Sequence, residues 1–238
     1  MGREGRFYNE KFYRELDSTR ESAAEILPIV IELLKPSSIV DIGCGSGHWL
    51  AAATKLGVTD ILGVDGDWVK ESQLAIPRDK FVPHDLSTPL KLGRRFDLAL
   101  SLEVAEHLPE LASSIFIRNL CSAADIVLFS AAIPGQGGRH HVNEQWPAYW
   151  ADLFQDAGYQ CYDVLRPRIW NNPRVAWYYA QNCMIFARKN VSSLGTPGCP
   201  FALVHPTLWS NQVAGLRSPG KLLERLPKAI LSKVLRRP

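Results

Sequence analysis

The residues best suited to chemistry in this chain are three glycines that follow a short apolar segment. Gly43, Gly45 and Gly47 form a G-x-G-x-G run directly after residues 38–42, and a helical stretch begins at His48. Because glycine has no Cβ, such a turn lets a small ligand rest against bare backbone. The pattern alone is a weak signal, since ordinary turns between a strand and a helix also use glycine.

Acidic residues at the ends of neighbouring strands sharpen this signal. Asp41 lies inside the first expected strand, Asp65 ends the second, and Asp85 follows the third. In a doubly wound sheet these points share one crevice at the carboxyl edge. Asp65 comes 18 residues after Gly47, where a carboxylate can bind both ribose hydroxyls, so an adenosine group is implied. A dinucleotide would favour G-x-G-x-x-G, but position 48 is His48, and Asp41 favours a cationic or zwitterionic ligand portion.

These residues belong to a regular alternation of strands and helices. Strands are expected at 38–42, 60–65, 80–83, 96–101, 125–131, 160–165 and 182–188, and helices at 18–34, 48–56, from about Trp68, 109–121 and 144–157. Asn143 and Gly158 are expected to cap the last of these helices. Continuous apolar strands divided by helices predict an α/β protein with a parallel sheet covered on both faces.

Composition agrees with a globular domain. Hydrophobic residues make up 46% of the 238 residues and charged residues 21%, which excludes a disordered or collagen-like chain. No apolar run approaches the roughly 20 residues that span a bilayer, and no secretory apolar core follows the charged opening, so we expect a cytoplasmic protein. The five scattered cysteines form no C-x-x-C pair and are expected to be reduced and mostly buried.

The chain changes in texture after Lys189, where Ser, Gly and Pro become frequent. We expect a domain over residues 1–190, with an N-terminal helical segment, and a basic tail over 191–238. The tail carries a net charge of +6 and the preceding domain −3. An amphipathic helix could begin at Ser218 and bind anionic lipid at the inner face of a membrane. The default alternatives are a tail that packs on the domain or is disordered.

Two segments resemble motifs of one enzyme family. Residues 40–47 (Val-Asp-Ile-Gly-Cys-Gly-Ser-Gly) look like the first motif of class I S-adenosylmethionine-dependent methyltransferases, and residues 96–108 look like their fourth-strand motif. The resemblance covers roughly residues 20–190. It implies a Rossmann-like doubly wound sheet of seven strands, in the order 3-2-1-4-5-7-6 with strand 7 antiparallel. It also implies S-adenosyl-L-methionine as methyl donor and S-adenosyl-L-homocysteine as product.

The resemblance further implies a set of cofactor-binding residues. The set comprises Asp41, Gly43, Gly45, Gly47, Asp65, Gly66, Asp85, Leu86 and Ser101. The three turn glycines would line the methionine and ribose portions, Asp41 would orient that end, and Asp65 would bind the ribose diol. Asp85 and the Leu86 amide would read the adenine edge, which Gly66 would border. Ser101 would pass close to the methionine portion.

A hydroxyl acceptor would need a base to remove its proton, and histidine, with a pKa of about 6.5, suits this task. His140 and His141 follow the glycine-rich segment 133–138, which is expected to cover the methyl group as a lid. Either of them could be the base, or the pair could only pack or cap before the next helix. His107, at the end of the fourth-strand motif, is the second candidate for the base, and Glu144 is the weakest candidate.

The acceptor region is rich in aromatic residues. Segments 141–150 and 175–182 are similar to parts of bacterial methyltransferases associated with polysaccharide and lipopolysaccharide gene clusters. Sugar rings stack on aromatic faces, so a sugar, glycan or related small-molecule hydroxyl is the predicted acceptor. The same aromatics could instead cover the sheet. Three arginines between residues 166 and 174 could hold a phosphate or uronate, or form a solvated rim.

Other partners are judged from spacing and charge. No His, Asp and Glu group at chelating spacing stands out in the acceptor region, so transfer without a metal is predicted. The alternative is a metal site that folding assembles from residues distant in the sequence. The acidic domain argues against nucleic acid as a partner, while the basic tail keeps RNA or protein methylation as an alternative. A further alternative is a non-catalytic cofactor-binding partner of a biosynthetic complex.

Overall fold

A computed structural model describes residues 10–217 of the chain. These residues fall into two compact units, 10–202 and 203–217, of which the second contains helix α7 (Pro206–Arg217). The helix predicted from Ser218 lies outside the described residues. Within residues 10–217, no helix combines the length and hydropathy that crossing a membrane requires.

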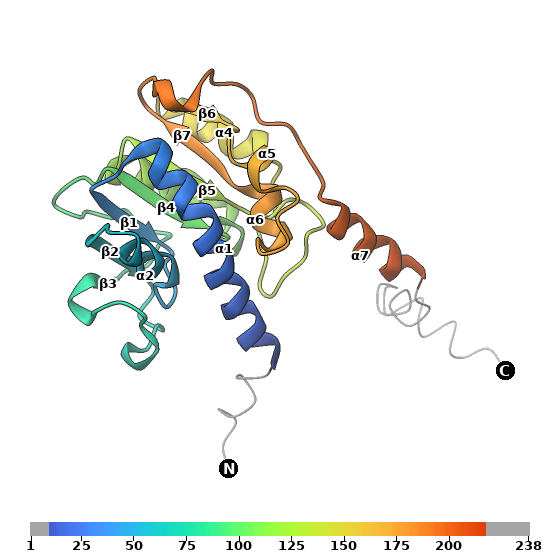
Figure 1. The fold of residues 1–238 in the computed structure, drawn as a ribbon, viewed down its shortest axis with the longest axis horizontal. Coiled ribbons are helices and arrows are strands. Elements are labelled where there is room, and N and C mark those ends of the chain that lie inside the picture. The colour runs from blue at the N-terminus through green and yellow to red at the C-terminus, as the bar shows by residue number, and fades with distance from the viewer. Residues whose placement is uncertain (1–9, 218–238) are drawn as a thin grey trace, which may run out of the picture. The chain divides into compact units, whose positions relative to one another are not determined.

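A seven-stranded sheet organises the first unit (Figure 1). Its strands are β1 (Ser38–Ile42), β2 (Asp60–Asp65), β3 (Phe81–Pro83), β4 (Leu98–Leu102), β5 (Ile126–Ser130), β6 (Gln160–Tyr162) and β7 (Met184–Ala187). Their order across the sheet is β3-β2-β1-β4-β5-β7-β6. The first five strands are parallel, and β7 runs antiparallel to both β5 and β6. The predicted fold class and strand order are therefore confirmed.

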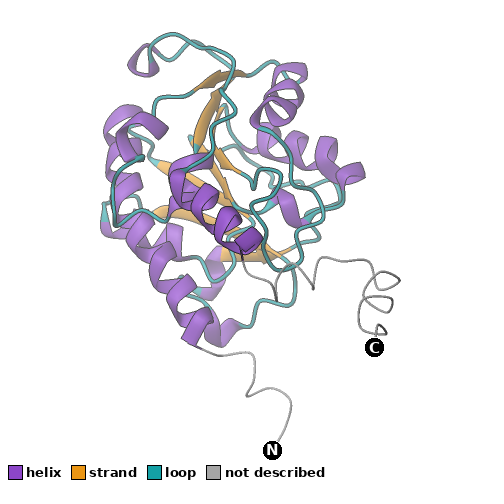
Figure 2. Ribbon diagram, turned by 90° about the vertical axis from the view of Figure 1, so that its right-hand side faces the viewer, coloured by secondary structure: helices purple, strands orange, loops and turns teal. Residues whose placement is uncertain are grey.

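Helices cover both faces of this sheet (Figure 2). The α-helices are α1 (Glu10–Leu34), α2 (His48–Lys55), α3 (Ser113–Ala123), α4 (Pro147–Asp156), α5 (Arg166–Ile169) and α6 (Trp177–Asn182). The 3-10 helices are η2 (Glu71–Gln73), η3 (Arg78–Lys80), η4 (Ala105–His107), η5 (Glu110–Ala112) and η6 (Ser192–Leu194).

Alternate residues of each strand serve the two faces, because successive side chains of a strand point to opposite sides. Ile39 belongs to a core shared with α1, α2 and α6, whereas its neighbour Val40 belongs to a core shared with α3 and α4. All five cysteines lie in the described residues and are free thiols, and all but Cys199 are buried, as predicted. Two cores thus hold the sheet and fix its carboxyl edge.

The helix predicted from about Trp68 is absent from the described structure, so that prediction is wrong. Residues 66–80 form turns and the short helices η2 and η3 instead. The reason is a tertiary contact. Ile76 is buried, and a Cβ added at Gly47 or Gly63 would lie 2.9 or 3.0 Å from its side chain. Packing of Ile76 against these glycines outweighs the local helical periodicity.

Helix α4 begins later than predicted. Trp146 is its N-cap residue and Pro147 takes the first helical position, where a missing N–H costs nothing. Asn143, predicted as the cap, is buried instead, and its Nδ2 donates a 2.9 Å hydrogen bond to Ser113 Oγ. The bond ties the segment after β5 to the start of α3. At the other end Gly158 follows the helix with a φ of 82°, as expected for a terminating glycine.

Candidate active site

The glycine turn between β1 and α2 has a backbone that only glycine adopts easily. Gly43, Gly45 and Gly47 have φ values of 93°, 52° and 79°. A Cβ at Gly43 would lie 2.4 Å from a methyl carbon of Val104, so the turn packs directly on the segment after β4. At Gly45, no described atom lies within 4 Å of the position that a Cβ would take. The turn is therefore tight on one side and open to a ligand at Gly45.

Two buried polar atoms near the carboxyl ends of β1 and β4 lack a partner. Asp41 Oδ2 and Ser101 Oγ make no hydrogen bond to any described residue. Burial raises the pKa of Asp41, and the nearby Asp65 raises it further. A buried polar group without a partner costs about 1–3 kcal/mol. Each atom therefore lacks a hydrogen bond that a polar ligand would supply, and the contact of both residues with the methionine portion stays a prediction.

The carboxylate of Asp65 is fixed by backbone amides. Its Oδ2 accepts a 2.7 Å hydrogen bond from Gly45 N, and its Oδ1 accepts one of 2.7 Å from Gly66 N. Burial raises the pKa of Asp65, and these two amides partly offset that rise. Each oxygen keeps a second lone pair that can accept from a ribose hydroxyl. The ring of Trp68 lies over Gly66, where a Cβ would be only 2.1 Å from it.

Asp85 and Leu86, predicted to read the adenine edge, lie just after β3. Asp85 is exposed, and its Oδ1 accepts hydrogen bonds from the backbone N and the Oγ of Ser87 at 2.9 and 2.6 Å. These bonds lower the pKa of Asp85. The Leu86 side chain is buried. The contact of both residues with adenine stays a prediction.

A second polar group lies beyond the carboxyl ends of β4 and β5. Glu103 has a φ of 56°, and its N–H donates to Ser130 O at 3.0 Å. Its carboxylate accepts hydrogen bonds from Gln136 Nε2 at 2.8 Å and Asn182 Nδ2 at 3.0 Å. Burial raises the pKa of Glu103, and these amides oppose the rise. Sequence reasoning did not single out this network, whose only signal was the place of Glu103 in the fourth-strand motif.

The structure brings together two of the three candidate histidines. The ring centroids of His107 and His141 are 4.9 Å apart, with the rings at 84° to each other. His141 Nδ1 lies 2.9 Å from Glu144 Oε1. Glu144 also accepts hydrogen bonds from the amides of Gly135, at 2.8 Å, and Gly137, at 2.7 Å. Burial lowers the pKa of His107, and His141 lowers it further, which favours a neutral imidazole at this position.

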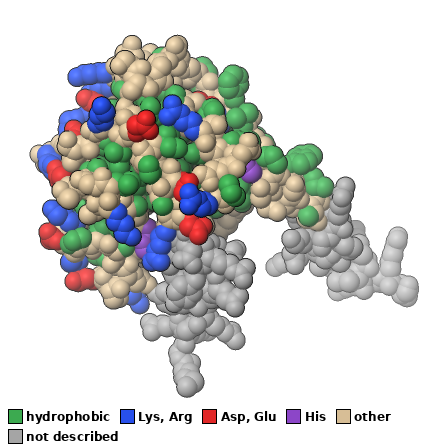
Figure 3. All heavy atoms as spheres, in the orientation of Figure 1, with side chains coloured by type: hydrophobic (Ala, Val, Ile, Leu, Met, Phe, Trp, Pro, Cys, Tyr) green, Lys and Arg blue, Asp and Glu red, His purple; other side chains and the backbone are tan. Residues whose placement is uncertain are grey.

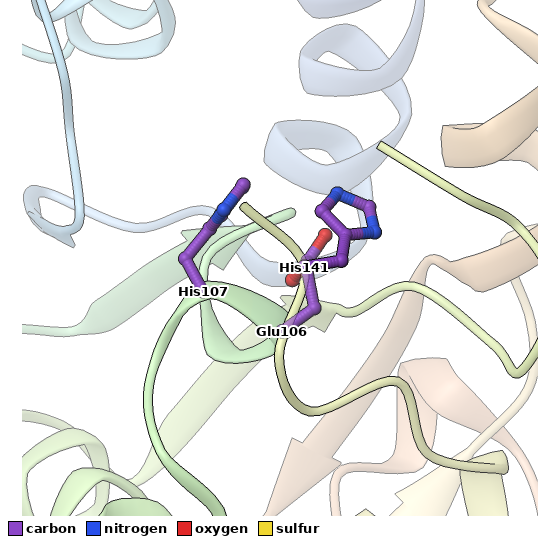
Figure 4. Close-up of side chains that lie close together, drawn as sticks. All are labelled: Glu106, His107 and His141. Carbon is purple, nitrogen blue, oxygen red and sulfur yellow. The ribbon is translucent and has the colours of Figure 1, made fainter. Parts of the chain in front are cut away.

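Glu106 lies beside both histidines (Figure 4). Its side chain is completely buried, and one ligand atom from each of Glu106, His107 and His141 lies within 4.8 Å of the others. His140 is exposed, has a φ of 62° and does not belong to this group. The prediction of transfer without a metal rested on sequence spacing. Spacing missed this cluster, because two of its residues end the fourth-strand motif and the third lies 34 residues later.

Several aromatic and arginine side chains of the acceptor region have structural partners. Trp150 is buried in the core beside α3, and Arg166 is buried and pairs with Asp163. Arg174 forms an ion pair of 2.6 Å with Glu25 on α1. Burial of Trp150 favours the alternative in which this ring covers the sheet. Arg166 does not form a solvated rim, because it is buried and paired with Asp163, whereas the exposed Arg174 does lie at the surface.

Comparison with known proteins agrees with this geometry. Residues 8–164 match the family model described as a methyltransferase domain, so the chain belongs to that family. Membership implies S-adenosylmethionine as the methyl donor. The open glycine turn, the unpartnered Asp41 Oδ2 and the fixed Asp65 fit the binding of this donor.

Individual relatives are more distant. A ubiquinone biosynthesis O-methyltransferase of Methylobacterium sp. (strain 4-46) is 31% identical over 103 residues, which cover 40% of this chain and 40% of that protein. The solved structure of Streptomyces venezuelae DesVI is 14% identical, covers 79% of this chain and 100% of its own, and has a TM-score of 0.56. Magnesium protoporphyrin IX methyltransferase from Synechocystis PCC 6803 is 20% identical, with coverages of 73% and 79% and a TM-score of 0.51. These two structures share the fold.

Proposed function

We propose that this chain transfers the methyl group of S-adenosylmethionine to a hydroxyl oxygen of a sugar, glycan or related small molecule. One observation carries the proposal. Gly43 and Val104 are in contact, so the turn that fits the donor adjoins the segment that bears Glu106 and His107. Methyl donor and acceptor hydroxyl would therefore meet at one edge of the sheet. The match to a protein named as an O-methyltransferase supports oxygen as the accepting atom.

The role of the protein in such a transfer is mainly to align the acceptor and exclude water. When bound, S-adenosylmethionine supplies an already activated methyl group. The acceptor hydroxyl would bind at the cluster of Glu106, His107 and His141. A carboxylate only accepts hydrogen bonds, so His141 Nδ1 donates to Glu144 and the Nε2 lone pair is directed elsewhere. His141 is therefore better placed than His140 to act on the acceptor.

The charge distribution does not favour nucleic acid as acceptor. On the face drawn in Figure 3, Lys and Arg side chains are interspersed with Asp and Glu. A protein that binds a phosphate backbone usually gathers basic residues into a patch or stripe. Small-molecule hydroxyls therefore remain the leading acceptors.

The experiment that tests this proposal has two stages. Calorimetry with S-adenosylmethionine measures donor binding, and incubation of the protein and methyl-labelled donor with fractionated cell extract identifies the acceptor class. We expect 1:1 binding and label in carbohydrate or small metabolites. Label confined to RNA or protein would contradict the acceptor class, and binding without any transfer would favour a non-catalytic partner.

Substitution of the histidines tests their role. His141→Ala should slow transfer by about 100-fold or more, the usual contribution of a group that activates a hydroxyl, and leave donor affinity nearly intact. His140→Ala is the matched variant, because the residue is adjacent but exposed and turned out of the cluster, and its effect should be much smaller. An equal fall in transfer rate in the two variants would contradict a role of His141 in acting on the acceptor.

A further inference from the structure

We propose that Glu106, His107 and His141 bind a divalent transition-metal ion, such as Mn²⁺ or Zn²⁺, that holds the acceptor oxygen. The metal-binding part of this inference stands by itself, and the role of the ion in transfer rests on the proposed function. Three features of the described structure carry it: the ligand geometry, an unpartnered buried carboxylate, and a carboxylate that orients one of the histidines.

The geometry comes first. One carboxylate oxygen and two imidazole nitrogens, each from a different side chain, lie within 4.8 Å of one another. Figure 4 shows the three side chains close together. Bonds from a first-row divalent ion to nitrogen or oxygen are about 2.0–2.2 Å long, so one ion could contact all three atoms after small side-chain movements. Imidazole together with carboxylate suits Zn²⁺, Fe²⁺ and Mn²⁺ better than Ca²⁺, which takes oxygen ligands almost exclusively.

The Glu106 carboxylate is otherwise unexplained. The side chain has 0% exposure, and neither carboxylate oxygen makes a hydrogen bond to a residue within the described range. Removal of a carboxylate from water without a partner is costly. A bound cation would supply a partner for the Glu106 carboxylate and interact favourably with the neighbouring Glu103 side chain.

His141 is oriented as metal-bound histidines usually are. Its Nδ1 donates to Glu144, so the lone pair that can bind a metal lies on Nε2. Histidines that bind metals commonly donate their other ring N–H to a carboxylate or carbonyl, which fixes the ring. Glu144 is itself held by the amides of Gly135 and Gly137. The outer carboxylate is therefore in place before any ion arrives.

The two segments that carry the ligands are also bonded to each other. The backbone carbonyl of Glu106 accepts hydrogen bonds from Val142 N at 2.9 Å and Asn143 N at 3.1 Å. Asn143 is anchored in turn to Ser113. The loop that bears His141 is thus held against the short helix that bears Glu106 and His107, so ion binding would not require a large rearrangement.

This site gives the cluster a definite role in the proposed transfer. A divalent ion next to the acceptor hydroxyl lowers the pKa of that hydroxyl, and the proton leaves to solvent. The oxygen then forms a bond to the methyl carbon as the carbon–sulfur bond breaks, and the electron pair stays on sulfur, which yields the neutral thioether S-adenosylhomocysteine. In this account His107 and His141 serve as ligands, and no imidazole has to take the proton.

Titration of the full chain with Mn²⁺ tests the site directly. The protein is first stripped with a chelator, and binding is followed by electron paramagnetic resonance with neither donor nor acceptor present. We expect one tight site per chain. Glu106→Gln and His107→Ala should each weaken Mn²⁺ binding by at least about 10-fold, and Glu144→Ala by about 10- to 100-fold.

Glu110→Gln is the matched control, because this acid is exposed on the neighbouring helix η5 and offers no ligand to the cluster, so Mn²⁺ binding should be unchanged. Unchanged S-adenosylmethionine affinity in each variant shows that the variant is folded. Wild-type protein that binds neither Mn²⁺ nor Zn²⁺ stoichiometrically would overturn the inference, as would wild-type affinity in Glu106→Gln. Mn²⁺ binding without methyl transfer would instead contradict only the proposed function.

Discussion

The proposed donor side and the proposed acceptor side of the site are built in different ways. On the donor side, backbone amides of Gly45 and Gly66 hold the carboxylate of Asp65, and all three residues lie within two consecutive strand–turn units. On the acceptor side, Glu103 is held by the side chains of Gln136 and Asn182, which lie 33 and 79 residues further along the chain. The donor side is therefore encoded locally, whereas the acceptor side exists only once the sheet has formed.

The largest expected effect comes from Gly43, the residue that joins the two sides. Gly43→Ala should lower the free energy of unfolding by about 2–4 kcal/mol, because it adds a strained positive φ and an overlap with Val104. Denaturant unfolding measures this change. Gly45→Ala is the matched control, since its φ is also positive but no described atom crowds it, and it should cost about 1–2 kcal/mol. Equal losses would mean that the contact with Val104 is unimportant.

The next effect separates the donor side from the acceptor side. Asp65→Ala should weaken S-adenosylmethionine binding by about 1.5–3 kcal/mol, because the ribose hydroxyls lose a charged acceptor. Calorimetry measures the donor, and Mn²⁺ binding at Glu106 should stay as in the wild type. Asp79→Ala, at an exposed acid between β2 and β3, serves as the control. Loss of both ligands in Asp65→Ala would show that the two sides do not act independently.

The smallest effect is expected on the acceptor side. Gln136→Ala removes the 2.8 Å hydrogen bond to Glu103 and bonds of 3.1 and 2.9 Å with Gln181 and Asn182. Unfolding should become easier by about 1 kcal/mol, and transfer should slow while donor affinity holds. Thermal unfolding and initial rates measure the two quantities, with Gln155→Ala on the exposed face of α4 as control. A fall in donor affinity with an unchanged transfer rate would contradict the separation of the donor side from the acceptor side.

The contrast between local and long-range contacts also explains which features could be predicted from the sequence. The strand order and the place of Asp65 follow from a glycine turn, apolar strands and a family motif, all of which are short-range patterns. The segment after Trp68 could not be predicted, because burial of Ile76 against Gly47 and Gly63 decides its shape. The sequence did not point to Glu106 as the proposed metal ligand, because the cluster also needs His141. His141 lies in a loop that comes near Glu106 only when the chain folds.

Val104 has a consequence for how this scaffold can acquire new acceptors. Its side chain fills the space over Gly43, so a side chain at position 43 has no room unless Val104 moves. With the proposed acceptor position, we expect changes of acceptor choice to come from the exposed residues of the loop after β5. Enzyme engineers who seek new specificities should randomise positions such as Arg139 and Val142, which are exposed, and keep Val104 fixed.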